Sequence, residues 1–259
     1  MRQTFRLILF ITAIILASGA YAAGNSRRMA PETLHYKVMF KWGLINKQAG
    51  TAVLSLRHGA ESYDATMAAR SEPWADRIFR VRDTLNGRMT YADFTPLVYE
   101  KIAHEGSEHK HDVVHYDYST PGLVKADCLR KVYKKGKLKV DETRQLTSEG
   151  NAIDMLTSFY YMRRLPYDTF KPGHVTEIDI FSGKRKELLT ITYHGIVDAD
   201  LDGTTSKTYY ITFTFTSGNG KKTSDDMEAW ISTDKERIPL RLEGKLPVGK
   251  VHCIYTGKE

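Results

Sequence analysis

The sequence predicts a mainly β protein in which one large, curved antiparallel sheet forms a barrel or half-barrel. Three observations lead to this fold class: apolar and polar residues alternate along most of the chain, turn signals recur at short intervals, and only two segments change to helical spacing. Such alternation buries one face of a strand and exposes the other, as in antiparallel sheets. A sheet of about a dozen strands must curl to cover its apolar face.

The clearest strands lie near the two ends of the chain. Residues 34–42 place Leu34, Tyr36 and Val38 on one face, and residues 208–216 alternate aromatic residues with threonine. Weaker alternation recurs over residues 52–56, 63–67, 189–193, 227–231 and 238–242. Glycine-containing or asparagine-containing turns are predicted at residues 57–60, 121–122, 134–137, 217–220 and 247–249.

Two segments have helical spacing instead. Apolar residues recur at Met155, Leu156, Phe159 and Met162, which predicts an amphipathic helix over about residues 151–164. Asn151 is expected to cap it, Asp154 favours its positive end, and Pro166 stops it. A shorter helix is expected over about residues 73–81, beginning at a proline. The longer helix is expected to pack across or beside the mouth of the barrel.

The first 22 residues are expected to be a cleaved signal peptide. Arg2 and Arg6 precede an apolar run over residues 7–17, and Ala20-Tyr21-Ala22 has the small-residue pattern of a cleavage site. The run is too short to be a good membrane span. We therefore expect an exported protein of the periplasm or cell envelope, soluble after cleavage and without a transmembrane span in the mature chain.

The remaining chain, residues 23–259, is expected to form a single antiparallel β domain. Its composition is ordinary for a folded domain, with 41% hydrophobic and 27% charged residues, which excludes disordered, collagenous and coiled-coil classes. The formal net charge of +7 includes two arginines of the expected signal peptide. The remaining excess suits a weakly basic surface, and nucleic acid is not an expected partner.

Two cysteines leave two alternatives open. Cys128 and Cys253 each lie on the apolar face of an expected strand. In an oxidising compartment they could form a disulfide, and closing so long a loop would stabilise the fold by roughly 4–5 kcal/mol at most. Alternatively, they are separate buried thiols that act as small apolar side chains.

Two clusters have the residue types of metal ligands. His109, His111 and His115 would share one face of a strand, but a flat strand spreads them over about 20 Å, and the charged neighbours Glu105, Glu108, Lys110 and Asp112 indicate an exposed hairpin. Asp198, Asp200 and Asp202 match the first half of a calcium loop, but Tyr209 stands where a bidentate glutamate is needed. A solvated face and an Asp-Gly hairpin are the simpler interpretations, and no metal is predicted.

A basic stretch over residues 130–139 holds six cations in ten residues. It could contact anionic lipid headgroups at a membrane surface. A lysine-rich hairpin that keeps a sheet edge soluble is the simpler interpretation.

Motifs of nucleophilic catalysis are missing from the sequence. It contains no Gly-x-Ser-x-Gly, His-Glu-x-x-His or Cys-x-x-Cys pattern, and no catalytic residue or cofactor is predicted. Aromatic side chains could instead line a pocket for an apolar or acyl ligand, although aromatics on a strand face are more often core. The predicted ligand-binding set is Tyr36, Phe40, Trp42, Trp74, Phe79 and Phe159.

Several of these segments, in this order, resemble a family of exported bacterial proteins. The resemblance runs over roughly residues 35–255 and rests on residues 34–50, 154–163, 230–239 and 247–249. The family is catalogued as domain of unknown function 3108, and the resemblance implies export without assigning a reaction or catalytic residues. The expected architecture is also similar to periplasmic carriers of lipoproteins, in which a curved sheet with a helical lid holds acyl chains.

Together these observations favour a non-catalytic envelope protein that binds an apolar ligand or an envelope partner. An envelope hydrolase whose site is assembled from distant residues is one alternative, because active sites can form only in the folded chain. A structural or assembly protein that uses its sheet edge or its basic hairpin as an interface is the other.

Overall fold

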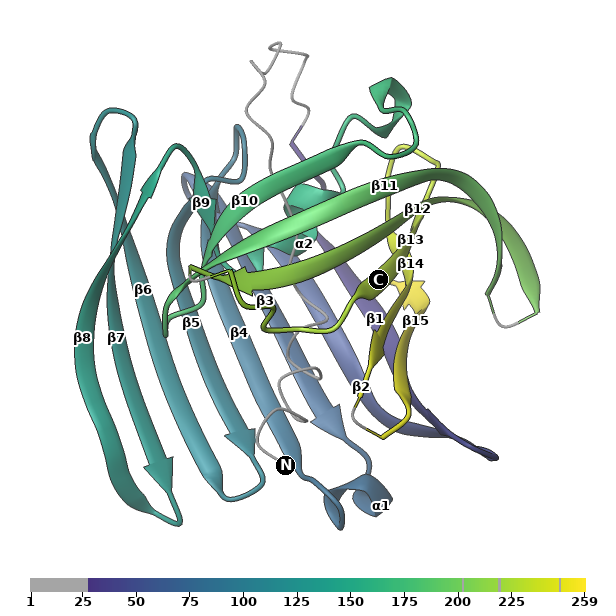
Figure 1. Ribbon diagram of the computed structural model, residues 1–259, viewed down its shortest axis with the longest axis horizontal. Helices are drawn as coiled ribbons and strands as arrows, with labels where there is room; N and C mark the ends of the chain where they lie inside the picture. The colour runs from purple at the N-terminus through teal and green to yellow at the C-terminus, as the bar shows by residue number, and fades with distance from the viewer. Residues whose placement is uncertain (1–27, 202, 219, 247) are drawn as a thin grey trace.

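The computed structural model describes residues 28–201, 203–218, 220–246 and 248–259, so the expected signal peptide lies outside the described residues. Fifteen strands, two short α-helices and one 3-10 helix make up the described fold (Figure 1). The strands are β1 Glu32–Trp42, β2 Ile45–His58, β3 Ser62–Ser71, β4 Val81–Thr90, β5 Pro96–Glu105, β6 Glu108–Thr120, β7 Leu123–Lys134, β8 Lys137–Glu149, β9 Ala152–Ile153, β10 Val175–Phe181, β11 Lys186–Leu201, β12 Thr204–Ser217, β13 Met227–Ser232, β14 Pro239–Lys245 and β15 Lys250–Lys258. The helices are α1 Pro73–Asp76, α2 Thr157–Met162 and the 3-10 helix η1 Tyr167–Thr169.

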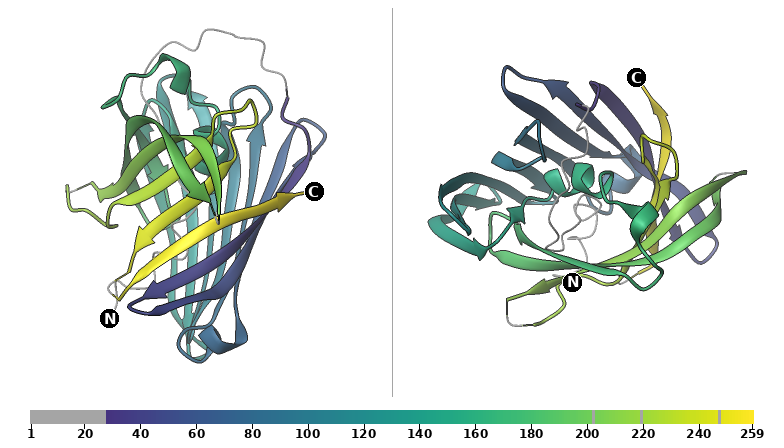
Figure 2. Two further views of the ribbon diagram at one scale, coloured as in Figure 1. Left: turned by 90° about the vertical axis from the view of Figure 1, so that its right-hand side faces the viewer. Right: turned by 90° about the horizontal axis from the view of Figure 1, so that it is seen from above.

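All fifteen strands belong to one sheet, which confirms the predicted fold class. Their order is β8-β7-β6-β5-β4-β3-β2-β1-β15-β14-β13-β12-β11-β10-β9, and neighbouring strands are antiparallel except β9 and β10. Strand β1 pairs with β2 on one side and with β15 on the other, so the first and last strands lie together in the middle of the sheet. The sheet curls into a nearly closed barrel (Figure 2).

Strict alternation places the core on the inner face of this barrel. Along β1, Leu34, Tyr36 and Val38 are buried and the residues between them are half-exposed. The same pattern in β3 and β12 turns Met67 and Phe213 inward. Apolar side chains from both halves of the sheet therefore meet in one continuous core, the arrangement that period-two patterning predicts.

Helix α2 packs inside the barrel and is shorter than the predicted helix (Figure 2). The segment predicted to begin a helix forms β9, which pairs with β10. The N-cap residue of α2 is Leu156 rather than the expected Asn151, and the Asp154 carboxylate just before it accepts hydrogen bonds from the Leu156 and Thr157 amides, each at 2.8 Å. All six helical residues are buried, so the helix is enclosed on every side rather than on one amphipathic face.

Helix α1 also ends earlier than the predicted 73–81. It consists of one turn, after which the Ile78 and Phe79 amides both donate to the Ala75 carbonyl and the chain turns into β4. Ile78 is 74% exposed, so the apolar residues of this segment do not share one buried face.

The barrel has a seam where the strands β8 and β9 lie at opposite edges of the sheet. Side chains cross it: the Ser148 hydroxyl of β8 donates to the Asp179 carboxylate of β10 at 2.6 Å. The rings of Tyr116 on β6 and Phe181 on β10 also stack across the seam, with centroids 5.8 Å apart. These contacts hold the edges together without main-chain pairing.

The inner face of β5–β7 differs from the prediction, which placed the residues around 105–112 on an exposed hairpin. Asp112 is 1% exposed and Glu105 is 7% exposed. Arg130 of the basic stretch also points inward, and its Nη1 lies 2.8 Å from Asp112 Oδ1. Lys101, Asp112 and Arg130 are paired neighbours on successive strands. Charged residues here occupy core positions, because an ion pair can satisfy them inside the barrel.

Candidate functional site

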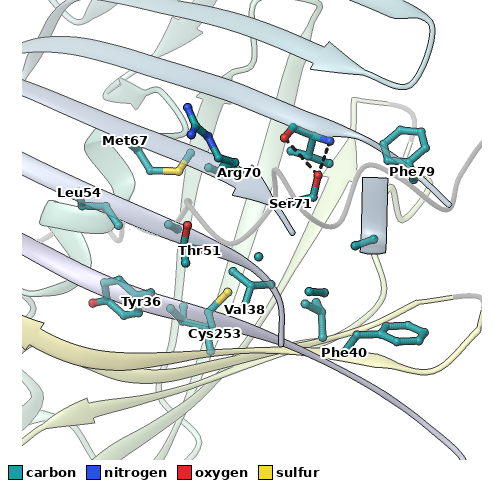
Figure 3. Close-up of a pocket in the computed structure, with 18 of the residues that line it drawn as sticks. Tyr36, Val38, Phe40, Thr51, Leu54, Met67, Arg70, Ser71, Phe79 and Cys253 are labelled. Carbon is teal, nitrogen blue, oxygen red and sulfur yellow. Dashed lines mark hydrogen bonds between the residues drawn. The ribbon is translucent and has the colours of Figure 1, made fainter. Parts of the chain in front are cut away.

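An apolar cavity of about 80 Å³ lies between β1–β3, β14 and β15 (Figure 3). Helix α1 contributes Ala75 to its wall, and α2 contributes Phe159. The strands supply most of the remainder of the wall. The first and last strands of the chain both contribute to it, because β15 pairs with β1 in the sheet. Its lining side chains are mainly aliphatic or aromatic, including Val38, Leu54, Met67, Leu242, Leu246 and Val251.

Small residues and an irregular strand account for the space. Ala52 and Ala69, which are paired neighbours on β2 and β3, both line the cavity. The pairing of β1 with β2 shifts by one residue after Val38, which leaves Ala49 as an extra residue, the arrangement of a β-bulge. At Gly50 the strands approach so closely that a Cβ atom would lie 2.5 Å from the Arg70 carbonyl oxygen. A side chain there would collide with the backbone of β3.

Four of the six predicted ligand-binding aromatics line this cavity: Tyr36, Phe40, Phe79 and Phe159. The other two do not. Trp42 is 55% exposed near the end of β1. Trp74 is half-buried, and its Nε1 donates to the Gln48 carbonyl at 2.7 Å.

Tyr36 and Phe159 form the inner end of the cavity. Their rings meet edge to face with centroids 6.3 Å apart. The Tyr36 hydroxyl donates to the Pro239 carbonyl at 2.9 Å, so its polar end is satisfied on the far side of the ring. Burial raises the pKa of Tyr36 well above its ordinary value, which keeps the phenol neutral. This end of the cavity therefore presents aromatic carbon.

Polar groups at the opposite end bond to one another. Ser71 Oγ accepts a hydrogen bond from the Val81 amide at 2.8 Å and another from Arg82 Nη1 at 3.0 Å. Arg82 Nη2 lies 2.7 Å from Asp76 Oδ2. Hydrogen bonds from Arg82 and then Ser71 lower the pKa of Asp76, so this carboxylate is charged and paired. The network closes the rim, and the cavity offers dispersion contacts and exclusion of water to an apolar group.

Several lining residues were not predicted, among them Ala52, Met67, Ala69 and Cys253. Each lies on the inner face of a strand, so alternation alone places them in the core. Which core positions border a cavity depends on the strand order, in particular on the pairing of β1 with β15.

The histidine cluster lies on the outer face of β5 and β6. The rings of His104 and His109 stack with centroids 4.1 Å apart, and His111 Nε2 lies 2.8 Å from Glu100 Oε1. His115 is exposed. Burial, with His104 nearby, lowers the pKa of His109. Within the described ranges, no three His, Cys, Asp or Glu side chains are grouped as metal ligands would be.

The acidic loop lies in the hairpin between β11 and β12. Asp198 and Asp200 belong to β11, and Asp202 lies outside the described residues. Asp200 Oδ1 accepts a hydrogen bond from the Gly203 amide at 2.8 Å, which is a local turn interaction.

The two cysteines are separate buried thiols. Cys128 lies on β7 and Cys253 on β15, and six strands separate β7 from β15 in the sheet order. Burial raises the pKa of Cys128 to about 12 and that of Cys253 in the same direction, so both thiols are protonated. Cys253 contributes apolar surface to the cavity.

Comparison with solved structures finds the same architecture in a crystal structure described as a beta-barrel-like protein of domain of unknown function DUF1849 from Brucella abortus. The match has a TM-score of 0.58 and 10% sequence identity, and covers 90% of this chain and 98% of that chain. At this identity the likeness concerns the fold alone.

No curated protein matches the sequence. No helix in the described part of the chain combines the length and apolar character needed to cross a bilayer. Comparison with protein families matches residues 34–253 to the family described as protein of unknown function DUF3108. This match covers most of the sequence and confirms the resemblance carried by its motifs, so the chain belongs to the DUF3108 family.

Proposed function

We propose that this protein is an exported, non-catalytic binding protein of the cell envelope whose apolar cavity holds an apolar group, such as the end of an alkyl chain. The observation that carries the proposal is the composition of the cavity wall, in which the lining is apolar and the polar groups at the rim are bonded to one another. Transfer of each methylene group from water to such a site contributes about 0.8 kcal/mol.

The size of the cavity limits the ligand. Its volume of about 80 Å³ is below the roughly 300–1,000 Å³ of sites that enclose a drug-sized molecule. It is also below the 150 Å³ engineered cavity that binds benzene. Only a short apolar tip fits this volume, and a longer ligand would need Phe40 or Phe79, which are half-buried, to swing outward.

A pair of alanines on β3 provides a direct test. Ala69 lines the cavity, while its neighbour Ala68 is exposed on the outer face. We expect Ala69→Leu to fill the space and weaken binding of a probe that carries a short alkyl tip about tenfold, since the lost contacts amount to about 1–2 kcal/mol. Ala68→Leu should leave probe binding unchanged. Equal affinities of the two variants would contradict the proposal, provided that circular dichroism and thermal melting show both folded.

Native ligands can be sought independently. Protein purified from its own cell envelope would be extracted with organic solvent, and the extract analysed by mass spectrometry beside one from the Ala69→Leu variant. An apolar compound enriched in the wild-type extract is expected. Equal extracts would count against a carrier role.

Export is a separate part of the proposal and rests on residues 1–22. We expect amino-terminal sequencing of the protein recovered from the envelope to begin at Ala23. A protein that retains Met1 and stays with the cytosolic fraction would contradict export, whatever the outcome of the binding experiments.

A further inference from the structure

A second and larger cavity is lined by residues from the start of β1 and β3 and from the segment that follows α2, elements that Figure 1 shows. Its volume is about 530 Å³, within the range of ligand pockets. One wall is aromatic, with Tyr63, Tyr91 and Phe94. Charged side chains make up most of the remainder.

The charges in this cavity do not balance. Five cationic and two carboxylate side chains line it. Arg163 is 4% exposed and is paired with Glu32 in the floor, and Lys258 Nζ lies 3.1 Å from Glu32 Oε2 and 2.7 Å from Glu236 Oε1. These four residues neutralise one another.

The other three cations form no salt bridge with a carboxylate of the described residues: Arg28, Arg164 and Lys235. Asp93 is a further acid that interacts with Arg164: against the effect of burial, hydrogen bonds from Thr90 and Thr95 and then the Arg164 charge lower the pKa of its carboxyl. Even with Asp93 included, the cavity carries an excess of positive charge. Such an excess attracts anions.

The aromatic wall holds two of these cations in place. The Arg28 guanidinium carbon lies 3.8 Å from the ring centroid of Tyr91, and that of Arg164 lies 5.0 Å from the ring centroid of Phe94. A guanidinium that stacks on a ring keeps its N–H edge available to an anion. One N–H group of Arg164 donates a hydrogen bond to the Ala92 carbonyl.

Phe94 reaches this wall through an unusual backbone conformation. Its φ of +61° lies in the left-handed region, which phenylalanine rarely adopts. The ring is 2% exposed and stacks on Tyr63 with centroids 4.8 Å apart, while Tyr63 meets Tyr91 edge to face at 4.7 Å. The turn between β4 and β5 thus presents an aromatic ring where glycine or asparagine would suit the backbone.

We propose that this cavity binds an anionic group, a phosphate or a carboxylate, belonging to a ligand that also has an apolar part. Arg28, Arg164 and Lys235 supply the positive charge, and the aromatic wall contacts the apolar part. The inference does not depend on the first cavity, whose lining shares no residue with this one.

Isothermal titration calorimetry on the mature protein tests this site with four probes: inorganic phosphate, dihexanoyl phosphatidate, hexanoate and hexyltrimethylammonium. We expect dihexanoyl phosphatidate to bind, and its affinity to fall as salt is raised because ion pairing is screened. Tighter binding of phosphatidate than of inorganic phosphate identifies a lipid-like source, and equal binding identifies free phosphate. Binding of hexyltrimethylammonium as tight as that of the anions, or no binding of any anion, would overturn the proposal.

Two variants assign the binding to this cavity. Lys235→Gln and Arg164→Gln should each weaken anion binding about two- to fivefold, and together about tenfold. Lys235 is exposed, so its substitution leaves the fold intact. Lys137→Gln, an equally exposed change on the β8 hairpin, is the control and should bind as the wild type does. Unchanged affinity in the folded double variant would overturn the proposal.

Discussion

The inner faces of β1–β3 and of β5–β7 belong to the same sheet, but different kinds of side chain are buried on them. On β1–β3, apolar side chains such as Val38, Leu54 and Met67 surround a cavity. On β5–β7, the equivalent inward positions hold Asp112 and Arg130, which pair through two oxygen contacts of 2.8 and 2.9 Å.

This difference decides which of the two walls can border open volume. An apolar wall can border open volume, because its atoms need no specific partner. A buried charge needs its counter-charge at a fixed place, so the inner positions of β5–β7 are filled by their own ion pair. Of these two regions, β1–β3 is therefore the one that can accept an apolar group, and β5–β7 is the one that depends on each of its charged side chains.

Asp112→Ala removes the inner ion pair of the charged wall and should have the largest effect on stability. It leaves the largely buried Arg130 with only the more distant and partly exposed Glu142, whose Oε1 lies 3.8 Å from Arg130 Nε, and we expect a loss of about 3–5 kcal/mol in the free energy of unfolding. Urea unfolding followed by circular dichroism measures this loss. The control is Asp141→Ala, which removes an exposed pair with Lys131 on the outer face and should cost less than about 1 kcal/mol. Equal losses would refute the structural role of the inner pair.

Leu54→Ala tests the apolar wall. Leu54 is 3% exposed and borders the cavity, so its truncation should cost about 3 kcal/mol and enlarge the cavity. The same variant should bind a small apolar probe more tightly, a gain that a defect of folding alone would not produce. Val53→Ala, on the outer face of the same strand, is the matched control. Weaker probe binding by folded Leu54→Ala would show that the enlarged space is not accessible.

Asp83 extends the comparison to pH. Burial, followed by the nearby Glu105 charge, raises the pKa of Asp83 from its ordinary value of 3.8 to about 7. A carboxyl with a raised folded pKa stabilises the fold most at low pH, and this contribution is lost as the pH rises from about 4 through 7. Between pH 5 and pH 8 we expect the wild type to lose about 2 kcal/mol of stability relative to Asp83→Asn. Urea titrations at both pH values measure the difference, and a constant difference would contradict this shift.

The fold class could be predicted because the alternation of β1 and β12 is clear in the residues themselves. The lengths of the helices could not. Ala152 and Ile153 fit a helical stripe equally well, yet they pair with β10, and sequence spacing does not reveal a partner strand. For the same reason Asp154, three residues after the predicted cap, forms the hydrogen bonds that begin α2.

The candidate site was predictable only in part. Tyr36, Phe40 and Phe159 were identified from strand and helix faces, and the structure places them around the cavity. Trp42 follows the same alternation as Tyr36, but it lies where β1 runs out of the barrel, and its exposure depends on where the neighbouring strands end. The inward position of Asp112 was missed because patterns of hydrophobicity cannot mark a core face that carries charges.

The pairing of β1 with β15 has a consequence for how the molecule is made. Leu34 lies opposite Lys258, so the hydrogen bonds on one side of β1 join residues more than two hundred positions apart. Contacts of such long range form late and slowly, since the intervening chain must be ordered before they can close. Strand β1 therefore has a pairing partner on only one side until β15 has left the ribosome. During that interval its open edge is the part of the nascent chain that most needs the protection of a chaperone.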